Sequence, residues 1–555
     1  MDPLVEKYIP EKLRREFSQK YWLNKTIGEV FDETVKKYPQ KEAIIFGSQR
    51  ITFQEFAEKV DSLVSGLLQI GIEPKDLVSV QLPNWPEFCF LQVALGKIGA
   101  ILGPLHMVYR ERELLSMLTF CESKAIVIPS EYKGFNYAET IQELWPKLPN
   151  LKQVIVLGEK VPKGMVSFKD LISNDPQNGR NRIKKISVDA NDLCYLNFTS
   201  GTEGIPKGFL HTFNTVLGGY YFYTRAEGES DEELSKKVIL AHSPMTHTFG
   251  FVVAYDPVLN GSKIILVERY DPGEALELLE RERITHMFGT PAHIIGLLHH
   301  EKFGKHDVSS MQEISIGGAP CPVELIKEIK DKIGCSVTNI YGMGETIAHT
   351  KTRKDDPPEL IFESVGKPIP GTEVGIFDDT RSFQLGVGEI GEIAYRGPFL
   401  FVCYFKDPQR TEDTRNSDGW FFTGDMGKVD EKGYLRLAGR KKDLINRGGT
   451  KIFPDDIENI LHLHPKILKA AVIGMPDYRL GEKVCAYIIP KKGESITLEE
   501  VVQFMESQKV MKYKIPERIE IVEEFPMLPS GKVKKEALRQ DIIEKLKKEQ
   551  SLSKG

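Results

Sequence analysis

The sequence predicts an α/β protein with a large N-terminal domain of two helix-covered, mostly parallel sheets and a small β-barrel, followed by a small C-terminal domain. Three observations predict this class. Apolar runs of strand length alternate with helical patterns over residues 27–364, which is typical of parallel sheets covered by helices on both faces. Residues 365–439 instead hold short strands between turns rich in Gly and Asp, which favours a small antiparallel barrel. Residues 440–555 are numerous enough to form a domain of their own.

The first part of the chain, residues 1–190, is expected to form one α/β subdomain with strands at 42–47 and 77–82. Between these strands, Thr52 and Glu55 have the spacing of a capping box. Apolar residues then repeat at helical spacing, at Phe56, Val60, Leu63 and Leu67. The most apolar stretch, 88–105, is interrupted by a charged residue and by helix breakers. We therefore expect a buried helix that runs into a strand there, and no membrane span.

A second α/β subdomain is expected over residues 191–364. Its strands are expected at 238–241, 263–267, 284–288, 313–316 and 336–341, and those of the barrel at 373–377, 392–395 and 434–437. Ligands of such α/β folds bind at the carboxyl ends of the strands. The lysine-rich end of the chain, 532–554, is expected to be a solvated helix with a frayed tail.

Composition argues against several classes of function. The formal net charge is -5, whereas a nucleic-acid-binding protein usually carries a basic face. Seven cysteines are scattered without a Cys-x-x-Cys pair, which indicates reduced thiols and no zinc site. The first residues lack the apolar core of a signal peptide, so a cytoplasmic location is expected.

The stretch around residues 195–212 is the most informative of the chain. An apolar run at 193–198 turns abruptly into TSGTEGIPKG at 199–208. Glycines let backbone N–H groups approach phosphate oxygens, hydroxyls add donors and lysine adds a positive charge, so this loop is predicted to hold a polyphosphate. A solvent-exposed turn is the alternative, because turns favour the same residue types. The predicted phosphate contacts are Thr199, Ser200, Gly201, Thr202, Glu203, Gly204 and Lys207.

Three further stretches suit a nucleotide. In SIGGAP at 315–320, two glycines would let the backbone lie flat against a planar ligand, although a plain strand-to-helix turn has the same residues. In NIYGMGET at 339–346, Tyr341 offers a ring that can stack on adenine, and Glu345 offers a hard oxygen ligand for Mg²⁺. Asp425 ends the stretch WFFTGD, expected at a strand–loop junction, where a carboxylate can accept hydrogen bonds from both ribose hydroxyls.

Together these motifs resemble the AMP-forming acyl-adenylate family, which comprises acyl-CoA synthetases, aryl-acid ligases, peptide-synthetase adenylation domains and luciferases. The resemblance extends from about residue 27 to residue 538. The C-terminal half, with GRKKDLINRGG and GEKVCAYIIP, is closest to dihydroxybenzoate-AMP ligases and to cyclic-acid or medium-chain CoA ligases. The resemblance implies that residues 1–439 form the adenylate-forming domain and that residues 440–555 form a mobile α+β lid, which swings about Lys442.

The resemblance also implies a role for each site residue. Glu345 would bind Mg²⁺, and Lys532 in the sequence PSGK would neutralise charge that develops during adenylation. His247 would border the acyl pocket, and Thr202 would act with these catalytic residues from the phosphate loop. Adenine, ribose and coenzyme A contacts are implied at Gly317, Gly318, Ala319, Asn339, Tyr341, Gly342, Thr346, Asp425, Arg440, Gly448 and Gly449.

Two positions depart from the family pattern. Relatives place Thr or Ser immediately before the metal-binding glutamate, where this chain has Gly344, so one hydroxyl contact near the phosphate is lost. Glu203 stands where relatives often have Thr. We expect the Glu203 side chain to point to solvent, because a carboxylate would repel a triphosphate.

The resemblance implies a role in fatty acid metabolism as an acid–CoA ligase, which uses ATP, Mg²⁺ and coenzyme A and passes through an acyl-adenylate. Acetate-specific relatives place Trp at the position of Gly342, and catechol-acid ligases place Asn at that of Thr248. These differences favour a short- to medium-chain aliphatic acid, including a hydroxy acid such as 4-hydroxybutyrate. A ligase that loads an aryl or alkyl acid onto a carrier protein stays open, as do a non-catalytic nucleotide-binding protein and a homo-oligomer.

Overall fold

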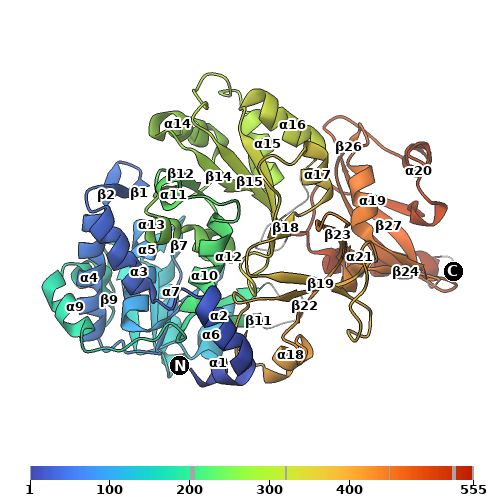
Figure 1. The fold of residues 1–555 in the computed structure, drawn as a ribbon. Helices are drawn as coiled ribbons and strands as arrows, with labels where there is room; N and C mark the ends of the chain where they lie inside the picture. Colours follow the sequence, from blue (N-terminus) through green and yellow to red (C-terminus); the bar gives the residue numbers. More distant parts are fainter. Residues whose placement is uncertain (1, 200–206, 319–321, 449, 528–532, 553–555) are drawn as a thin grey trace. The chain divides into compact units, whose positions relative to one another are not determined.

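The computed structural model describes residues 2–199, 207–318, 322–448, 450–527 and 533–552 of the chain (Figure 1). Within this part, the backbone forms two compact units. The first unit takes its residues from 2–374 and 395–421, and the second from 375–394 and 422–552. The chain therefore returns to the first unit after it has entered the second.

The first unit contains a nine-stranded sheet in the order β18-β17-β16-β15-β14-β12-β13-β1-β2. The strands from β16 to β1 are parallel, and the flanking strands β17, β18 and β2 are antiparallel to their neighbours. Their bounds are β1 (Glu42–Phe46), β2 (Gln49–Thr52), β12 (Val238–Ala241), β13 (Lys263–Leu266), β14 (His286–Gly289), β15 (Glu313–Gly317), β16 (Ser336–Tyr341), β17 (Thr350–Lys351) and β18 (Lys367–Pro368).

A second, eight-stranded sheet of the same unit has the order β21-β11-β10-β4-β3-β5-β8-β9. It is parallel from β10 to β9, whereas β11 and β21 are antiparallel to their neighbours. The strands are β3 (Leu77–Val80), β4 (Ile101–Pro104), β5 (Ala125–Pro129), β8 (Gln153–Leu157), β9 (Val166–Ser167), β10 (Leu193–Thr199), β11 (Lys207–Thr212) and β21 (Cys403–Tyr404), and a separate hairpin pairs β6 (Glu131–Tyr132) with β7 (Phe135–Asn136).

The two sheets exchange strands along the sequence. The early strands β1 and β2 belong to the nine-stranded sheet, whereas β10, β11 and β21 belong to the other. The predicted subdomain boundary at residues 190 and 191 therefore does not coincide with the boundary between the sheets. The expectation of two helix-covered, mostly parallel sheets is confirmed.

Helices fill the space between the two sheets and cover their outer faces. One buried cluster joins apolar side chains of both sheets with those of α3, α4, α5 and α10, so these helices form a shared middle layer. Two further clusters pack α14, α15 and α16 on the nine-stranded sheet, and α6 and α7 on the eight-stranded one. The helices are α1 (Pro3–Tyr8), α2 (Glu11–Lys20), α3 (Ile27–Lys37), α4 (Phe53–Gln69), α5 (Pro86–Ile98), α6 (Glu111–Cys121), α7 (Tyr137–Leu144), α8 (Phe168–Ile172), α9 (Pro176–Ile183), α10 (Phe213–Thr224), α11 (Asp231–Ser235), α12 (Thr248–Val253), α13 (Asp256–Asn260), α14 (Pro272–Glu282), α15 (Pro291–Leu298), α16 (Val323–Lys332), α17 (Pro358–Glu363) and α18 (Pro408–Asp413).

Two helices form for the reasons that the sequence suggested. Thr52 and Glu55 make the capping box at the start of α4, and the apolar repeat that follows is buried. The apolar stretch at 88–105 becomes α5, whose side chains are almost all buried, followed by β4. In the described part of the chain, we find no helix with the length and apolar character that crossing a bilayer requires.

The second unit ends in an α+β fold. A five-stranded sheet has the order β25-β24-β27-β26, with β28 added beside β27. Its apolar face packs against α19 and α20, around Val472, Val484 and Val501. The elements are β24 (Ile445–Arg447), β25 (Thr450–Ile452), α19 (Pro454–Leu461), β26 (Ile467–Asp477), β27 (Gly481–Pro490), α20 (Leu498–Ser507), β28 (Arg518–Ile521) and α21 (Lys535–Leu552).

The predicted small barrel at 365–439 is wrong. Four strands form a sheet in the order β19-β20-β22-β23, and among the described residues β23 does not pair back with β19. Four short strands are too few to close around a packed interior, so they remain an open sheet. Their bounds are β19 (Glu373–Phe377), β20 (Gly391–Arg396), β22 (Phe421–Val429) and β23 (Leu435–Arg440).

Candidate active site

The carboxyl end of β15 carries the first predicted nucleotide contacts. Gly318 has φ +81°, a left-handed conformation that favours glycine. Among the residues that the structure describes, a Cβ added there would find only Thr290 within 4 Å, with Cγ2 at 3.8 Å. A Cβ at Gly317 would lie 2.8 Å from the Ile340 side chain. Packing at Gly317 and the backbone conformation at Gly318 therefore both favour glycine, while Ala319 lies outside the described residues.

Tyr341 ends the neighbouring strand β16, and its ring is half-buried. The His349 ring lies edge-on to it, with centroids 4.8 Å apart and an interplanar angle of 76°. Burial lowers the pKa of His349 to about 3, so this ring is neutral at pH 7. His349 therefore fixes Tyr341 from one side, a contact that sequence reasoning missed because nothing around residue 349 marks it.

Glu345 follows the same strand and is only 3% exposed. The Tyr404 hydroxyl donates to Glu345 Oε1 at 2.9 Å, and the Phe401 N–H donates to the Glu345 carbonyl oxygen at 2.7 Å. Burial, and then the charge of Glu345, raise the pKa of Tyr404 well above its ordinary value, so the phenol stays protonated. Mg²⁺ is commonly bound by one or two carboxylates together with phosphate oxygens, and this buried, oriented carboxylate fits that role.

Two other predicted residues of this stretch bind the protein itself. The Asn339 amide donates to the carbonyl oxygens of Ile361 and Ser364, at 3.2 and 3.0 Å. Thr346 is fully buried, and its hydroxyl donates to the carbonyl oxygen of Met343 at 3.3 Å. These donors hold α17 against β16 and close the turn before Glu345, so the structure gives both residues a role in shaping the loop.

Gly342 is exposed, but the direction in which a side chain would leave its Cα is blocked, contrary to the argument that glycine here leaves room for a longer acid. A Cβ added at Gly342 would lie 2.6 Å from the carbonyl oxygen of Ile347 and 2.9 Å from Cα of Ala348. Both neighbours are backbone atoms and cannot rotate away. Glycine is therefore needed here because the loop 342–349 folds back on itself.

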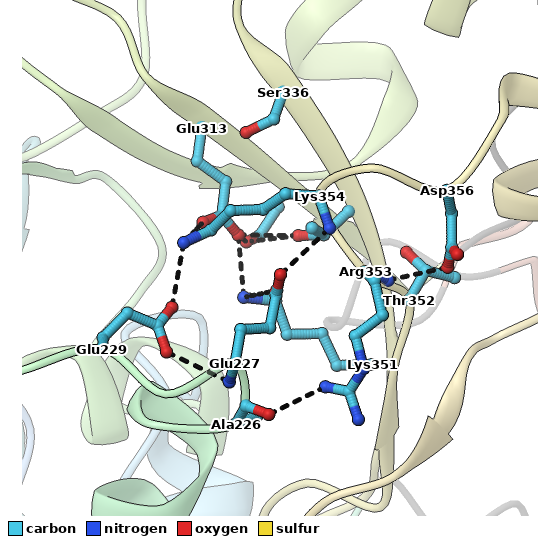
Figure 2. Close-up of polar contacts among 12 residues, drawn as sticks. Ala226, Glu227, Glu229, Glu313, Ser336, Lys351, Thr352, Arg353, Lys354 and Asp356 are labelled. Carbon is cyan, nitrogen blue, oxygen red and sulfur yellow. Dashed lines mark hydrogen bonds and ion pairs between the residues drawn. The ribbon is translucent and has the colours of Figure 1, made fainter.

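The far end of this loop is held by a buried cluster of charged side chains, shown in Figure 2. Lys351 Nζ of β17 lies 3.0 Å from Glu313 Oε1 and 3.3 Å from Glu227 Oε1. Lys354 Nζ lies 3.0 Å from Glu229 Oε1. Burial alone would raise the pKa of Glu313 and lower that of Lys351, but their mutual attraction reverses both shifts. The cluster therefore ties β17 to β15 and to the segment after α10 through paired charges.

The predicted phosphate loop joins β10 to β11 in an antiparallel hairpin. Thr199 and Lys207 are register partners at the end of this hairpin next to the connecting loop, and the Lys207 side chain is exposed. The remaining predicted contacts lie outside the described residues, namely Ser200, Gly201, Thr202, Glu203 and Gly204.

His247 lies at the start of α12 and is exposed. Its Nδ1 accepts from the N–H of Phe249 at 3.3 Å, and its ring is stacked with that of His106 at a centroid distance of 6.5 Å. The next residue, Thr248, accepts through its hydroxyl from the Asn197 amide of β10 at 3.3 Å. Through Thr248, the start of α12 is thus tied to the strand that leads to the predicted phosphate loop, and the place of His247 at an acyl pocket stays a prediction.

In the second unit, Asp425 and Arg440 are register partners on β22 and β23. Arg440 Nε lies 3.0 Å from Asp425 Oδ1. Asp425 was expected at a strand–loop junction, but it lies inside β22, beside a register shift at Met426 and Gly427. Such irregularities re-aim side chains. The Arg440 side chain orients the Asp425 carboxylate, so the two residues form an ion pair within the sheet.

The residues predicted to move with the lid are only partly described. Lys442 lies in the short 3₁₀ helix Lys441–Asp443, where Lys441 pairs with Glu392 at 2.8 Å. Gly448 has φ +59°, which favours glycine. Gly449 and Lys532 lie outside the described residues.

Two protein families match parts of this chain. Residues 31–405 match the description "AMP-binding enzyme", and residues 456–532 match "AMP-binding enzyme C-terminal domain". Together the two matches span every predicted site residue from Thr199 to Lys532 except Asp425, Arg440, Gly448 and Gly449, which lie between them.

The chain is also similar to named proteins over nearly its full length. It is 33% identical to a medium-chain fatty-acid–CoA ligase of Escherichia coli (strain K12), covering 95% of this chain and 92% of that protein. It is 32% identical to a 2,3-dihydroxybenzoate-AMP ligase of Bacillus subtilis (strain 168), covering 95% of each. Among solved structures, ATP-bound MatB from Rhodopseudomonas palustris is 27% identical, with a TM-score of 0.82, covering 93% of this chain and 99% of that one.

Proposed function

The chain belongs to the family of AMP-binding enzymes, and on this premise we propose that it is an AMP-forming acid–CoA ligase. It would convert ATP, a carboxylic acid and coenzyme A into an acyl-CoA, AMP and diphosphate. The observation that carries the proposal is Glu345, a buried carboxylate oriented by Tyr404 at the carboxyl end of β16. This is the place in an α/β sheet where a nucleotide with its metal ion binds.

In the first half-reaction, a carboxylate oxygen attacks the α-phosphorus of ATP, the bond to the bridging oxygen breaks and diphosphate leaves. Gly317, Gly318 and Tyr341 would hold adenine, and the 199–207 loop would hold the phosphates. Glu345 would hold Mg²⁺, which neutralises phosphate charge when it is bound. Lys532 would stabilise the charge that develops between the acid and the α-phosphate. Most of the catalysis is thus positioning and charge neutralisation.

In the second half-reaction, the thiolate of coenzyme A attacks the acyl carbon, and the bond from that carbon to AMP breaks. By resemblance, the C-terminal part would turn about Lys442, remove Lys532 and present the loop with Gly448 and Gly449 to the thiol. Asp425 and Arg440 would bind the ribose as a pair. Such a hinge motion alternates two sets of residues at one substrate.

The substrate that we propose is a short- to medium-chain aliphatic acid, with a hydroxy acid such as 4-hydroxybutyrate as a candidate. Thr248 supports it, because its hydroxyl accepts from Asn197 and replaces the amide that catechol-acid ligases carry. The similarity to a medium-chain fatty-acid–CoA ligase also supports it. Gly342 no longer contributes to this argument, since backbone atoms occupy the space beside it.

We expect Gly342→Trp to lower activity on every acid instead of shifting the preference toward acetate and propionate. The indole would displace the backbone of the loop that carries Glu345, because the atoms next to the added Cβ belong to the backbone and no side chain can rotate to make room. Initial rates on straight-chain acids of two to ten carbons would test this. A variant with good activity on acetate alone would show that the loop opens to admit the ring and that Gly342 does set chain length.

The proposed function is tested by carboxylate-dependent exchange of labelled diphosphate into ATP over a broad panel of acids. Aliphatic acids should support exchange, and free coenzyme A should then accept the acyl group. Exchange with 2,3-dihydroxybenzoate, followed by transfer only to a phosphopantetheinyl carrier protein, would instead favour the ligase that loads a carrier. The similarity to a dihydroxybenzoate-AMP ligase makes that outcome worth measuring. No exchange with any acid would leave a non-catalytic nucleotide-binding protein.

A further inference from the structure

The residue before Glu345 is Gly344, and an aromatic ring fills the space that a side chain at this position would occupy. A Cβ added at Gly344 would overlap the ring of Phe209, with Cε1 2.5 Å away. Gly344 does not have a positive φ, so its backbone could accept an ordinary residue. The three atoms nearest to that Cβ all belong to the ring of Phe209, a fully buried residue of β11.

A second residue of β11 holds the same glycine. Nε2 of His211 lies 2.8 Å from the carbonyl oxygen of Gly344, which accepts the hydrogen bond. His211 is completely buried, and burial lowers its pKa to about 4, so at pH 7 the neutral ring carries its proton on Nε2. Phe209 and His211 are two residues apart in β11, so their side chains lie on the same face of the sheet and both contact the loop.

The strand beside β11 supplies the third contact. Tyr404 of β21 is the register partner of Phe209 on β11. Its ring packs against Phe401 at a centroid distance of 4.8 Å, and its hydroxyl donates to Glu345 Oε1 at 2.9 Å. Two adjacent strands therefore hold two successive loop residues: β11 fixes the backbone of Gly344, and β21 fixes the carboxylate of Glu345.

We infer that Tyr404 is a positioning residue for the metal-binding carboxylate of Glu345, and that Phe209 and Gly344 are a matched pair that fixes the backbone beside it. The metal part of this inference rests on the proposed function, whereas the packing part does not. β11 is also the strand that leaves the predicted phosphate loop. The arrangement therefore couples the residue that would bind Mg²⁺ to the loop that would bind the phosphates of the same nucleotide.

Tyr404→Phe tests the positioning role, because it removes the hydroxyl and keeps the ring. Outer residues that orient a metal ligand typically change metal affinity by about 10- to 100-fold when they are removed. The Mg²⁺ concentration that gives half of the thermal stabilisation by ATP should rise by about that factor. This readout measures metal and nucleotide binding without turnover.

Tyr220→Phe is the matched control. The Tyr220 hydroxyl donates to the buried carboxylate of Asp256 at 2.6 Å, so the substitution removes the same kind of bond away from Glu345. It should lower thermal stability but leave the Mg²⁺ requirement unchanged. An unchanged Mg²⁺ requirement in Tyr404→Phe, or an equal rise in both variants, would overturn the inference. A wild-type protein that ATP and Mg²⁺ fail to stabilise would count against the proposed function instead.

A double-mutant cycle on the protein without nucleotide tests the matched pair. Gly344→Ala should lower the melting temperature by several degrees, because the methyl group meets the Phe209 ring. In a Phe209→Leu background, Gly344→Ala should lower the melting temperature clearly less, since the smaller leucine side chain leaves room for the methyl group. The effects of the two substitutions should therefore be strongly non-additive. Additive effects would show that the ring and the glycine are not matched.

Discussion

Replacing Lys532 with alanine is expected to slow adenylation by about 10²–10³-fold, the loss seen when one donor that stabilises developing charge is removed. Transfer of the acyl group from supplied acyl-AMP to coenzyme A should continue near the normal rate, because in the proposed mechanism this lysine leaves the site before the thiol enters. Diphosphate exchange measures the first half-reaction, and thioester formation from synthetic acyl-AMP measures the second.

Lys534→Ala is the matched control for Lys532→Ala. The Lys534 side chain is exposed and lies two residues away in the same basic segment, so its removal should change neither half-reaction. Lys535 would be a poor control, because its amine lies 2.7 Å from Glu458 and its side chain is only 15% exposed. Equal losses in both half-reactions of Lys532→Ala would contradict the two-conformation mechanism.

The sequence was most informative where local pattern and burial agree. The sequence predicts the strands β12 and β16 and the helix α4 within a residue or two. β12 is a continuous apolar run, VILA, which is typical of a parallel strand buried on both faces, and α4 has both a capping box and an apolar repeat. β16, SVTNIY, mixes apolar and polar residues. The strand β11 was missed. Its sequence KGFLHT contains a buried histidine and a buried threonine, so neither an apolar run nor an alternating pattern marks it.

Sheet membership could not be predicted from local pattern at all. β21 has only two residues, and it pairs with β11, which lies almost two hundred positions earlier in the chain. Its Tyr404 looks like part of an ordinary apolar run, FLFVCYF, yet its hydroxyl orients Glu345. The barrel at 365–439 failed for the same reason, since turn spacing predicts strands but does not say whether the first and last of them meet.

The same limit of local pattern applies to the candidate site. Tyr341 and Glu345 stay predictions as ligand contacts, and the structure places Tyr341 at the end of β16 and Glu345 in the turn that follows. Asn339 and Thr346 lie in the same motif, yet their donors serve the loop. A motif indicates which segment is at the site, whereas hydrogen bonds over long sequence separations decide which side chains are left for a ligand.

Replacing Lys351 with methionine is expected to destabilise the first unit by about 3–5 kcal/mol at pH 7, because removal of one partner leaves a buried charge uncompensated. Glu313 and Lys351 are 3% and 4% exposed, so water cannot replace the lost amine. The midpoint of unfolding in urea would measure the loss. Lys354→Met should cost less, although its amine pairs with Glu229 at 3.0 Å, since the Lys354 side chain is itself 34% exposed and lies 3.8 Å from Glu313.

Replacing both members of the pair, as in Lys351→Met with Glu313→Leu, should recover much of the stability, because no unpaired charge then remains. If Lys351→Met shifts the urea midpoint no more than Lys354→Met does, the cluster in Figure 2 does not behave as a buried ion pair. A double variant less stable than Lys351→Met would indicate that hydrogen bonds to Glu313 from Ser315 and Thr338 outweigh its charge.

The loss of stability caused by Lys351→Met should also depend on pH. The charges around Glu313 determine whether this loss grows or shrinks as the pH falls. In the native protein the pKa of Glu313 lies below its ordinary value, so its contribution to stability is present above the unfolded pKa and is lost as the pH falls. Without Lys351, burial dominates and should raise that pKa, so the variant should gain stability on acidification as the carboxyl takes up a proton. The difference between the two proteins should therefore shrink from pH 7 to pH 5. His286 is neutral at pH 7, because burial, then Lys237, lowers its pKa to about 3. Lys237 and Lys354 are positively charged and lower the pKa of Glu313, so they oppose burial and make the expected change smaller. A difference that grows on acidification would mean that Glu313 is not the group left uncompensated.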